Sequence, residues 1–170
     1  MTEEATHRKV DSHREAVAPR RMTRLDRTEA LRLLGTVSLG RVVFTHEALP
    51  AVRPVNHLID KGEVIVQLHD GAALTSIVAP TDTEGVVVAY EADAIDPVTH
   101  LGWSVVVTGY AHRVTDDRDL ERYAVTLRPW VQHHAMNAAL RIRPELVTGL
   151  RLTAEPAPAA ATPDGLSDHS

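Results

Sequence analysis

One apolar run, residues 85–91 (Gly-Val-Val-Val-Ala-Tyr-Glu), constrains the fold of this chain more than any other segment. Its length suits a single β-strand, and it offers no polar face that could be turned toward water. Such a run predicts a strand that is buried on both sides, either in the wall of a barrel or in the seam between two copies of the chain.

Segments rich in β-branched residues indicate further strands on both sides of this run. They are 41–45, 51–59, 63–68, 103–114, 139–142 and 146–152. Asp60-Lys61-Gly62 predicts a hairpin turn between strands 51–59 and 63–68. Gly109 predicts a bulge or bend within strand 103–114. The last two strands are expected to lie on either side of Pro144, and residues 93–102 are expected to form a loop.

Short helices are predicted at 26–34, 72–79 and 117–127. Asp26 is suited to cap the first helix together with Glu29, and Gly35 fits the position just after its end. Six or seven strands with two or three small helices predict a mainly β fold, a small mixed barrel with helices at its periphery.

The composition is that of one ordinary globular domain. The chain has 170 residues, no cysteine, and 23 acidic against 18 basic residues, for a net charge of −5. The absence of cysteine excludes disulfides, thiolate metal sites and cysteine nucleophiles, and the acidic balance argues against a nucleic-acid partner. No apolar run reaches the roughly 18 residues of a membrane helix, and the charged N-terminus lacks the apolar core of a secretory signal. We therefore expect a cytoplasmic protein without a membrane partner.

The two ends differ from the middle of the chain. Residues 1–21 mix charges of both signs, and residues 154–170 are rich in proline, alanine and aspartate. Neither segment carries the apolar residues that a core needs. The sequence thus predicts flexible tails at 1–21 and 154–170 around one domain at 22–153.

Familiar catalytic and metal motifs are missing. No HExxH, GxSxG, Walker A or GxGxxG pattern occurs in the sequence. His46, His57 and His69 come from neighbouring predicted strands and could converge on a metal, but exposed strand or turn positions explain them equally well.

Two other segments gain meaning when they are taken together. The first contains Arg53-Pro54-Val55-Asn56-His57, and the second is the strand-to-helix junction of residues 67–74, which contains Gly71. A helix that starts after a glycine turn presents free backbone N–H groups, and a nearby arginine can bind a phosphate in a forked geometry. Arg53 and this junction therefore predict a phosphate site. The alternative is that Arg53 is a solvent-facing strand residue and Gly71 an ordinary turn.

In order and spacing, these segments resemble the flavin-binding split-barrel family related to pyridoxamine 5′-phosphate oxidase, in particular its actinobacterial branch. The resemblance covers residues 25–152. It is carried by LLGTVSLGRVVF, RPVNH, VVVAYEAD, WSVVVTGYAHRV and RIRPELVTGLRL. It implies a mainly β (α+β) fold, a six-stranded split β-barrel with short peripheral helices, which forms a homodimer and binds FMN in a cleft between the protomers.

The resemblance also implies a set of cofactor-binding residues. Arg53 would contact the phosphate, and Pro54, Val55 and Asn56 would line the isoalloxazine edge. The remaining positions are Leu68, His69 and Asp70 along the ribityl-phosphate side, Ala73 and Leu74 at the helix start, Trp103 and Ser104 beside the flavin, and Trp130 near the cleft. Relatives usually carry a Ser/Thr-Lys pair after the junction glycine, whereas this chain has Gly71-Ala72-Ala73-Leu74. That change is expected to weaken FMN binding, because a charge-assisted hydrogen bond is worth about 1.5–3 kcal/mol.

Three functions are compatible with these residues. The first is an FMN-dependent oxidoreductase that transfers a hydride to or from a small organic substrate, with His57 or His69 as a candidate for proton supply and no assigned catalytic residue. The second is a non-catalytic split-barrel protein that binds haem or another metabolite, with His57, His69 or His133 as a candidate ligand. The third is a reductase that uses the deazaflavin coenzyme, whose longer anionic tail needs a basic groove.

Overall fold

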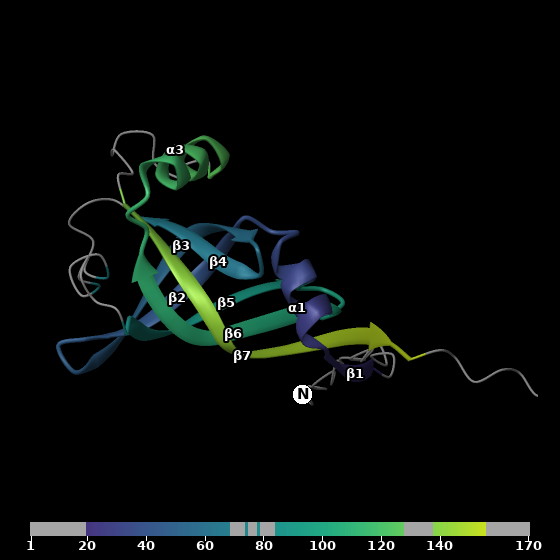
Figure 1. The fold of residues 1–170 in the computed structure, drawn as a ribbon. Helices are drawn as coiled ribbons and strands as arrows, with labels where there is room; N and C mark the ends of the chain where they lie inside the picture. Colours follow the sequence, from purple (N-terminus) through teal and green to yellow (C-terminus); the bar gives the residue numbers. More distant parts are fainter. Residues whose placement is uncertain (1–19, 69–73, 75–77, 79–83, 128–137, 156–170) are drawn as a thin grey trace, which may run out of the picture.

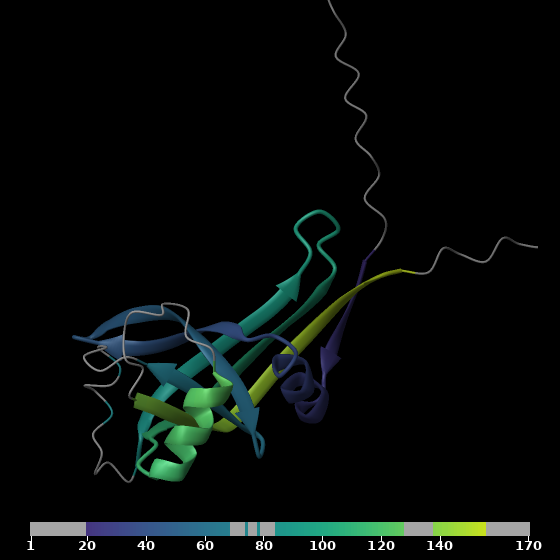
Figure 2. The same ribbon diagram turned by 90° about the horizontal axis from the view of Figure 1, so that it is seen from above.

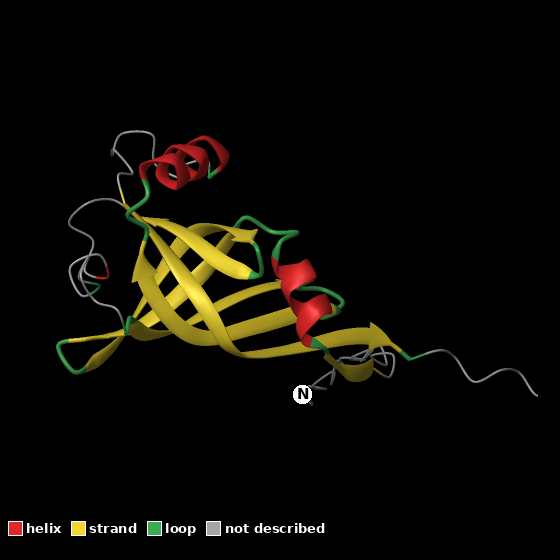
Figure 3. Cartoon of the chain, in the orientation of Figure 1, coloured by secondary structure: helices red, strands yellow, loops and turns green. Residues whose placement is uncertain are grey.

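The computed structural model describes residues 20–68, 74, 78, 84–127 and 138–155. Within these residues the chain forms seven strands and two helices, and the strands make up the body of the molecule (Figure 3). In chain order the elements are β1 (Arg20–Leu25), α1 (Arg27–Leu34), β2 (Leu39–His46), β3 (Leu49–Asp60), β4 (Glu63–Leu68), β5 (Val86–Ile95), β6 (Gly102–Arg113), α3 (Asp117–Thr126) and β7 (Ala138–Ala154).

All seven strands belong to one antiparallel sheet that closes on itself. The strand order is β1-β7-β4-β3-β2-β5-β6, and an additional pairing between β7 and β6 completes the barrel (Figure 1). β7 pairs with β4 through residues 138–142 and with β1 through residues 149–154, while β6 runs beside it over most of its length. The predicted split-barrel fold is confirmed, with seven strands in place of six.

β7 corrects the prediction of two closing strands. It is one strand of 17 residues that runs through Pro144 without a break. Opposite Pro144 the register shifts at Gly109, where a Cβ atom would lie 1.9 Å from the Arg143 carbonyl oxygen. A bulge tolerates proline, which has no N–H to give to the ladder, so Pro144 does not end the strand. The predicted bulge at Gly109 is confirmed.

β1 accounts for the extra strand. Its six residues pair with the end of β7, from Arg20 opposite Ala154 to Leu25 opposite Gly149. Five of the six residues are exposed, so β1 has no apolar pattern that could mark it in the sequence. Both predicted tails are therefore slightly too long, because Arg20, Arg21 and Ala154 belong to paired strands. Figure 2 shows β1 beside the far end of β7.

The elements between these strands mostly follow the sequence pattern. Asp26 caps α1 by accepting a hydrogen bond from the Glu29 backbone N–H at 2.8 Å, and α1 buries Ala30 and Leu34 completely. The predicted 93–102 loop is shorter in the structure, because β5 continues to Ile95 and β6 begins at Gly102. Most of the predicted 72–79 helix lies outside the described residues. Neither helix of the described part is long and apolar enough to cross a membrane.

The apolar run at 85–91 is buried on one side only within a single chain. Val88 and Tyr90 face the core at 2% and 0% exposure, whereas Val87 between them is 60% exposed. The prediction of burial on both sides is therefore wrong for one chain, since the outer side of β5 is uncovered.

Candidate functional site

Arg53 lies where β3 leaves the body of the barrel. β3 pairs with β4 only from His57 onward, so Arg53 belongs to the part of the β2–β3 hairpin that projects beyond this pairing (blue, lower left in Figure 1). Its side chain is exposed and its Nη1 donates to the Val52 carbonyl oxygen at 2.8 Å. Among the described residues no carboxylate forms an ion pair with Arg53.

The predicted neighbours of Arg53 divide into two groups. Pro54 is exposed and Asn56 half-buried, as expected for residues beside a ligand. Val55, Leu68 and Leu74 are 7%, 5% and 1% exposed and pack in the main core. Because their side chains are buried in the core, these three residues can contact a cofactor only with their backbone atoms. His69, Asp70, Ala73 and Trp130 lie outside the described residues, as does His133.

His57 corrects the predictions that made it a proton donor or a haem ligand. It is 3% exposed, its Nε2 donates to the Leu34 carbonyl oxygen at 2.8 Å, and its Nδ1 accepts from the Tyr90 hydroxyl at 2.6 Å. A carbonyl can only accept, so Nε2 carries a proton, and in the neutral ring Nδ1 is then the acceptor for the Tyr90 hydroxyl. Burial lowers the pKa of His57 and so favours this neutral form. Both ring nitrogens are used inside the core, and neither can bind a metal or a substrate.

Trp103 and Ser104 point to opposite sides of β6. Trp103 is 8% exposed and packs in the core, whereas Ser104 opens onto the outside of the sheet. There Ser104 lines a cavity of about 360 Å³. The other lining residues are Arg24, Leu25, Val106, Val147, Thr148, Gly149 and Leu150. The cavity is thus mainly apolar, with one guanidinium and two hydroxyls.

Arg53 and Ser104 lie on opposite faces of the same sheet. Arg53 stands directly opposite Val42, and Val42 is opposite Tyr90, so Arg53 belongs to the core-facing side. Ser104 stands opposite Asp93 on one side and Leu150 on the other, in a row that faces outward. Directly opposed residues share a face of an antiparallel sheet. Within one chain the sheet therefore separates Arg53 from Ser104.

The outward side of the sheet, called the outer face below, is unusually apolar. One row of directly opposed residues crosses five strands: Val52, Val43, Ala89, Thr108 and Leu146. Large apolar side chains on this face are between 40% and 63% exposed: Met22, Val52, Val87, Leu146 and Leu150. An outward sheet side is usually polar where water covers it, so this one is suited to contact another protein surface. Sequence reasoning found Val87 but missed the others, because only the register places them on one face.

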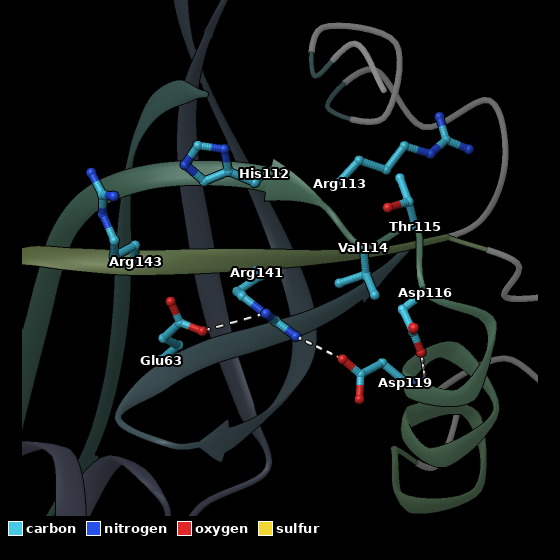
Figure 4. A pocket seen from close by; sticks show the side chains of 9 residues that line it. All are labelled: Glu63, His112, Arg113, Val114, Thr115, Asp116, Asp119, Arg141 and Arg143. Atoms are coloured by element: carbon cyan, nitrogen blue, oxygen red, sulfur yellow. Dashed lines mark hydrogen bonds and ion pairs between the residues drawn. The ribbon is translucent and has the colours of Figure 1, made fainter. Parts of the chain in front are cut away.

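A second cavity, of about 310 Å³, lies between α3, β4, β6 and β7 (Figure 4). Arg141 crosses it between two carboxylates, with Nε 3.3 Å from Glu63 and Nη2 2.9 Å from Asp119. His112 and Arg143 line its rim, so acidic and basic groups are mixed. Among the described residues no group of three His, Asp or Glu side chains is arranged to hold a metal. His46, at the hairpin tip, and the buried His57 do not converge.

Comparison with known proteins agrees with this architecture. The family model for pyridoxamine 5′-phosphate oxidase matches residues 26–151. The uncharacterised protein Rv0080 of Mycobacterium tuberculosis is 51% identical over 136 residues, which cover 80% of this chain and 89% of that protein. An FAD-binding protein from Mycobacterium smegmatis has a similar structure, with a TM-score of 0.57 and 28% identity over 77% of this chain and 98% of the other.

A third relative shares the fold alone. It is an FAD- and haem-binding protein from Mycobacterium smegmatis, with a TM-score of 0.57 and 17% identity over 80% of this chain and 76% of the other. The match over residues 26–151 takes in all the described strands except β1 and the end of β7. The chain therefore belongs to the pyridoxamine 5′-phosphate oxidase family.

Proposed function

We propose that this protein binds a flavin between two copies of the chain and acts as an oxidoreductase on a small organic substrate. The observation that carries the proposal is the division of the predicted flavin residues between the two faces of one sheet. A flavin cannot touch Arg53 and Ser104 of the same chain when the sheet separates them. A second copy that covers the outer face around the projecting β2–β3 hairpin would bring its own Ser104 cavity toward that hairpin, which carries Arg53.

The residues present suit the phosphate and the apolar parts of a flavin. Arg53 offers a guanidinium that no described carboxylate neutralises, and the cavity at Ser104 offers Arg24, two hydroxyls and apolar walls. In this arrangement Arg53 would hold the phosphate, and the backbone at Pro54 and Val55 would pass beside the ring system. The bound flavin would supply the hydride chemistry. The chain's own part is to bind and orient the flavin and to exclude water from it.

FMN is the cofactor that the sequence resemblance implies, and FAD is the alternative that a relative supports. A terminal phosphate carries close to two negative charges, whereas each phosphate of the FAD pyrophosphate carries one. Ala73 stands where relatives carry a lysine, so the chain has less positive charge for a dianion. FAD therefore suits this chain at least as well as FMN, and the two are separated by direct titration.

The other two candidate functions have less support. Haem binding cannot use His57 as an axial ligand, since both ring nitrogens of His57 form hydrogen bonds in the core. The deazaflavin coenzyme needs a basic groove, whereas the described residues that line the cavity at Ser104 include one arginine, Arg24. A cytoplasmic location stays a prediction.

Titration of the full-length protein with FMN, FAD and riboflavin tests the proposal, with flavin fluorescence as the readout. Arg53→Ala is expected to raise the Kd for FMN or FAD about ten- to a hundredfold, because a charge-assisted hydrogen bond is lost. Riboflavin has no phosphate, so its Kd is expected to stay within about twofold of wild type. Arg118→Ala, on the exposed side of α3, removes the same charge elsewhere and serves as the matched control.

Two results would count against the proposal. If wild type binds none of the three flavins, the protein is not a flavoprotein. If Arg53→Ala leaves all three Kd values unchanged, Arg53 does not bind the phosphate. An absorbance spectrum of the purified protein gives an independent check, since a flavin absorbs at about 375 and 450 nm and haem at about 410 nm.

A further inference from the structure

The outer face carries a cluster of charged side chains on β2 and β5. Arg41 on β2 lies beside two carboxylates on β5, with Nη1 3.3 Å from Glu91 Oε2 and 3.7 Å from Asp93 Oδ2. Two acidic groups thus share one guanidinium. When both are ionised the cluster has a net charge of −1, and the Glu91 side chain is only 28% exposed.

The neighbouring strands bring no second cation to this cluster. Glu91 faces Val106 on β6, and Arg41 faces Pro54 on β3. Asp93 faces Ser104 on β6, and Leu150 on β7 follows in the same row before Arg24 on β1. Two strands therefore separate Arg24 from the cluster. Burial and the nearby Asp93 together raise the pKa of Glu91, although Arg41 acts in the opposite direction.

We propose that association of two copies through the outer face takes up protons at the Arg41–Glu91–Asp93 cluster, so that acid favours the dimer. This inference rests on the dimer of the proposed function. Closing the face removes water from a carboxylate that has no guanidinium of its own, and an unpaired charge is costly to bury. Binding a proton at the carboxyl pair removes that cost.

The expected pH dependence follows from proton linkage. The dimer holds more protons than two separate chains, so its Kd falls as the pH falls and rises as the pH rises. Each copy contributes one cluster, so up to two protons are taken up per dimer. One proton changes the Kd about tenfold per pH unit and two change it about a hundredfold. The Kd is therefore expected to rise with pH over the range in which the carboxyl pair holds a proton in the dimer but not in the separate chains.

Sedimentation velocity of the full chain over a concentration series, at several pH values from 5.5 to 8.5, measures this dependence. Glu91→Gln keeps the shape of the side chain but removes one ionisable group, so its dimer Kd is expected to stay the same across the pH series. Asp93→Asn leaves Glu91 alone with Arg41 and is expected to give the same result. Glu121→Gln on α3 lies outside the Arg41–Glu91–Asp93 cluster and is expected to keep the wild-type pH dependence.

The outcomes separate the dimer from its proton linkage. A chain that stays monomeric at every pH and concentration contradicts the proposed dimer itself. A dimer whose Kd does not change with pH overturns only the inference, and would mean that the partner supplies a cation such as its own Arg24. A pH dependence that survives in both Glu91→Gln and Asp93→Asn also overturns it, because histidines or other groups would then be the titrating ones.

Discussion

At the scale of single residues, the bond between Tyr90 and His57 organises the core beside the candidate site. It joins β5 to β3, and the second bond of His57 continues to the last turn of α1 through the Leu34 carbonyl. Burial raises the pKa of Tyr90 far above its usual value, so the hydroxyl stays protonated and can donate. The pair thus anchors β3 just after the segment that carries Arg53, and it takes no part in proton transfer outside the core.

Gly40 provides the space that this pair needs. A Cβ atom at Gly40 would lie 2.2 Å from the Tyr90 hydroxyl oxygen and 2.6 Å from the Glu91 carbonyl oxygen. Gly40→Ala must therefore displace Tyr90 or the β2 backbone, and we expect the free energy of unfolding to fall by about 1–3 kcal/mol. Urea unfolding followed by tryptophan fluorescence measures the change.

Gly35→Ala is the matched control for this substitution. At Gly35 the added Cβ would have no neighbour closer than 3.5 Å, and the backbone has an ordinary φ of −69°. This variant is expected to stay within about 0.5 kcal/mol of wild type. Equal effects of the two substitutions would show that the space beside Tyr90 is not what Gly40 provides.

At the scale of elements, a polar network around Tyr123 joins α3 to the barrel, beside the apolar cluster in which Tyr123 packs with Ile65 and Ala139. The Tyr123 hydroxyl donates to Asp60 Oδ2 at 2.6 Å, and Arg122 and Arg141 each link Asp119 to this group. Tyr123 is only 1% exposed, so on folding its hydroxyl loses its hydrogen bonds to water and forms bonds to these partners instead. Arg122 and Tyr123 together lower the pKa of Asp60 to about 2, which keeps it ionised over the physiological range.

Tyr123→Phe is expected to lower the free energy of unfolding by about 1–2 kcal/mol, because Asp60 loses a hydrogen bond while the ring still packs. Thermal unfolding by circular dichroism checks this. Tyr110→Phe is the control, since the hydroxyl of Tyr110, half-buried on β6, donates to no described residue. If Tyr123→Phe lowers the melting temperature no more than Tyr110→Phe does, the polar network does not stabilise the attachment of α3.

At the scale of the whole molecule, the outer face predicts how the chain assembles. Leu146 is 58% exposed in the row that crosses this face, so a charge there costs a single chain little. In a dimer closed through the outer face the same charge would be buried without a partner. Leu146→Glu is therefore expected to weaken the dimer at least a hundredfold, and to leave the melting temperature of the monomer within about 2 °C, as for other exposed positions.

Val125→Glu gives the comparison for this experiment. Val125 is 85% exposed on α3, which packs over Ile65 of β4 and lies outside the row that crosses the outer face. Light scattering is expected to find this variant as dimeric as wild type. Loss of the dimer in both variants, or in neither, would place the contact between copies elsewhere.

Local signals in the sequence account for the elements and their ends. Asp26 and Glu29 mark the start of α1, and Gly109 marks the bulge. The predicted turn after Asp60 is also confirmed, since Lys61 and Gly62 have φ angles of 52° and 81°. Each of these features depends on a few consecutive residues, whose capping and turn preferences do not need the rest of the fold.

Only the tertiary structure decided how these elements meet. β1 was missed because its pairing with β7 joins the two ends of the domain, and an exposed edge strand carries no apolar pattern. His57 was misjudged because its partners, Leu34 and Tyr90, are distant in the sequence. The division of Arg53 and Ser104 between two faces likewise depends on strand register, since a shift of one residue exchanges the faces of a strand. The sequence by itself determined the family, the barrel and the candidate residues, whereas register and long-range pairing decided which of those residues can share a site.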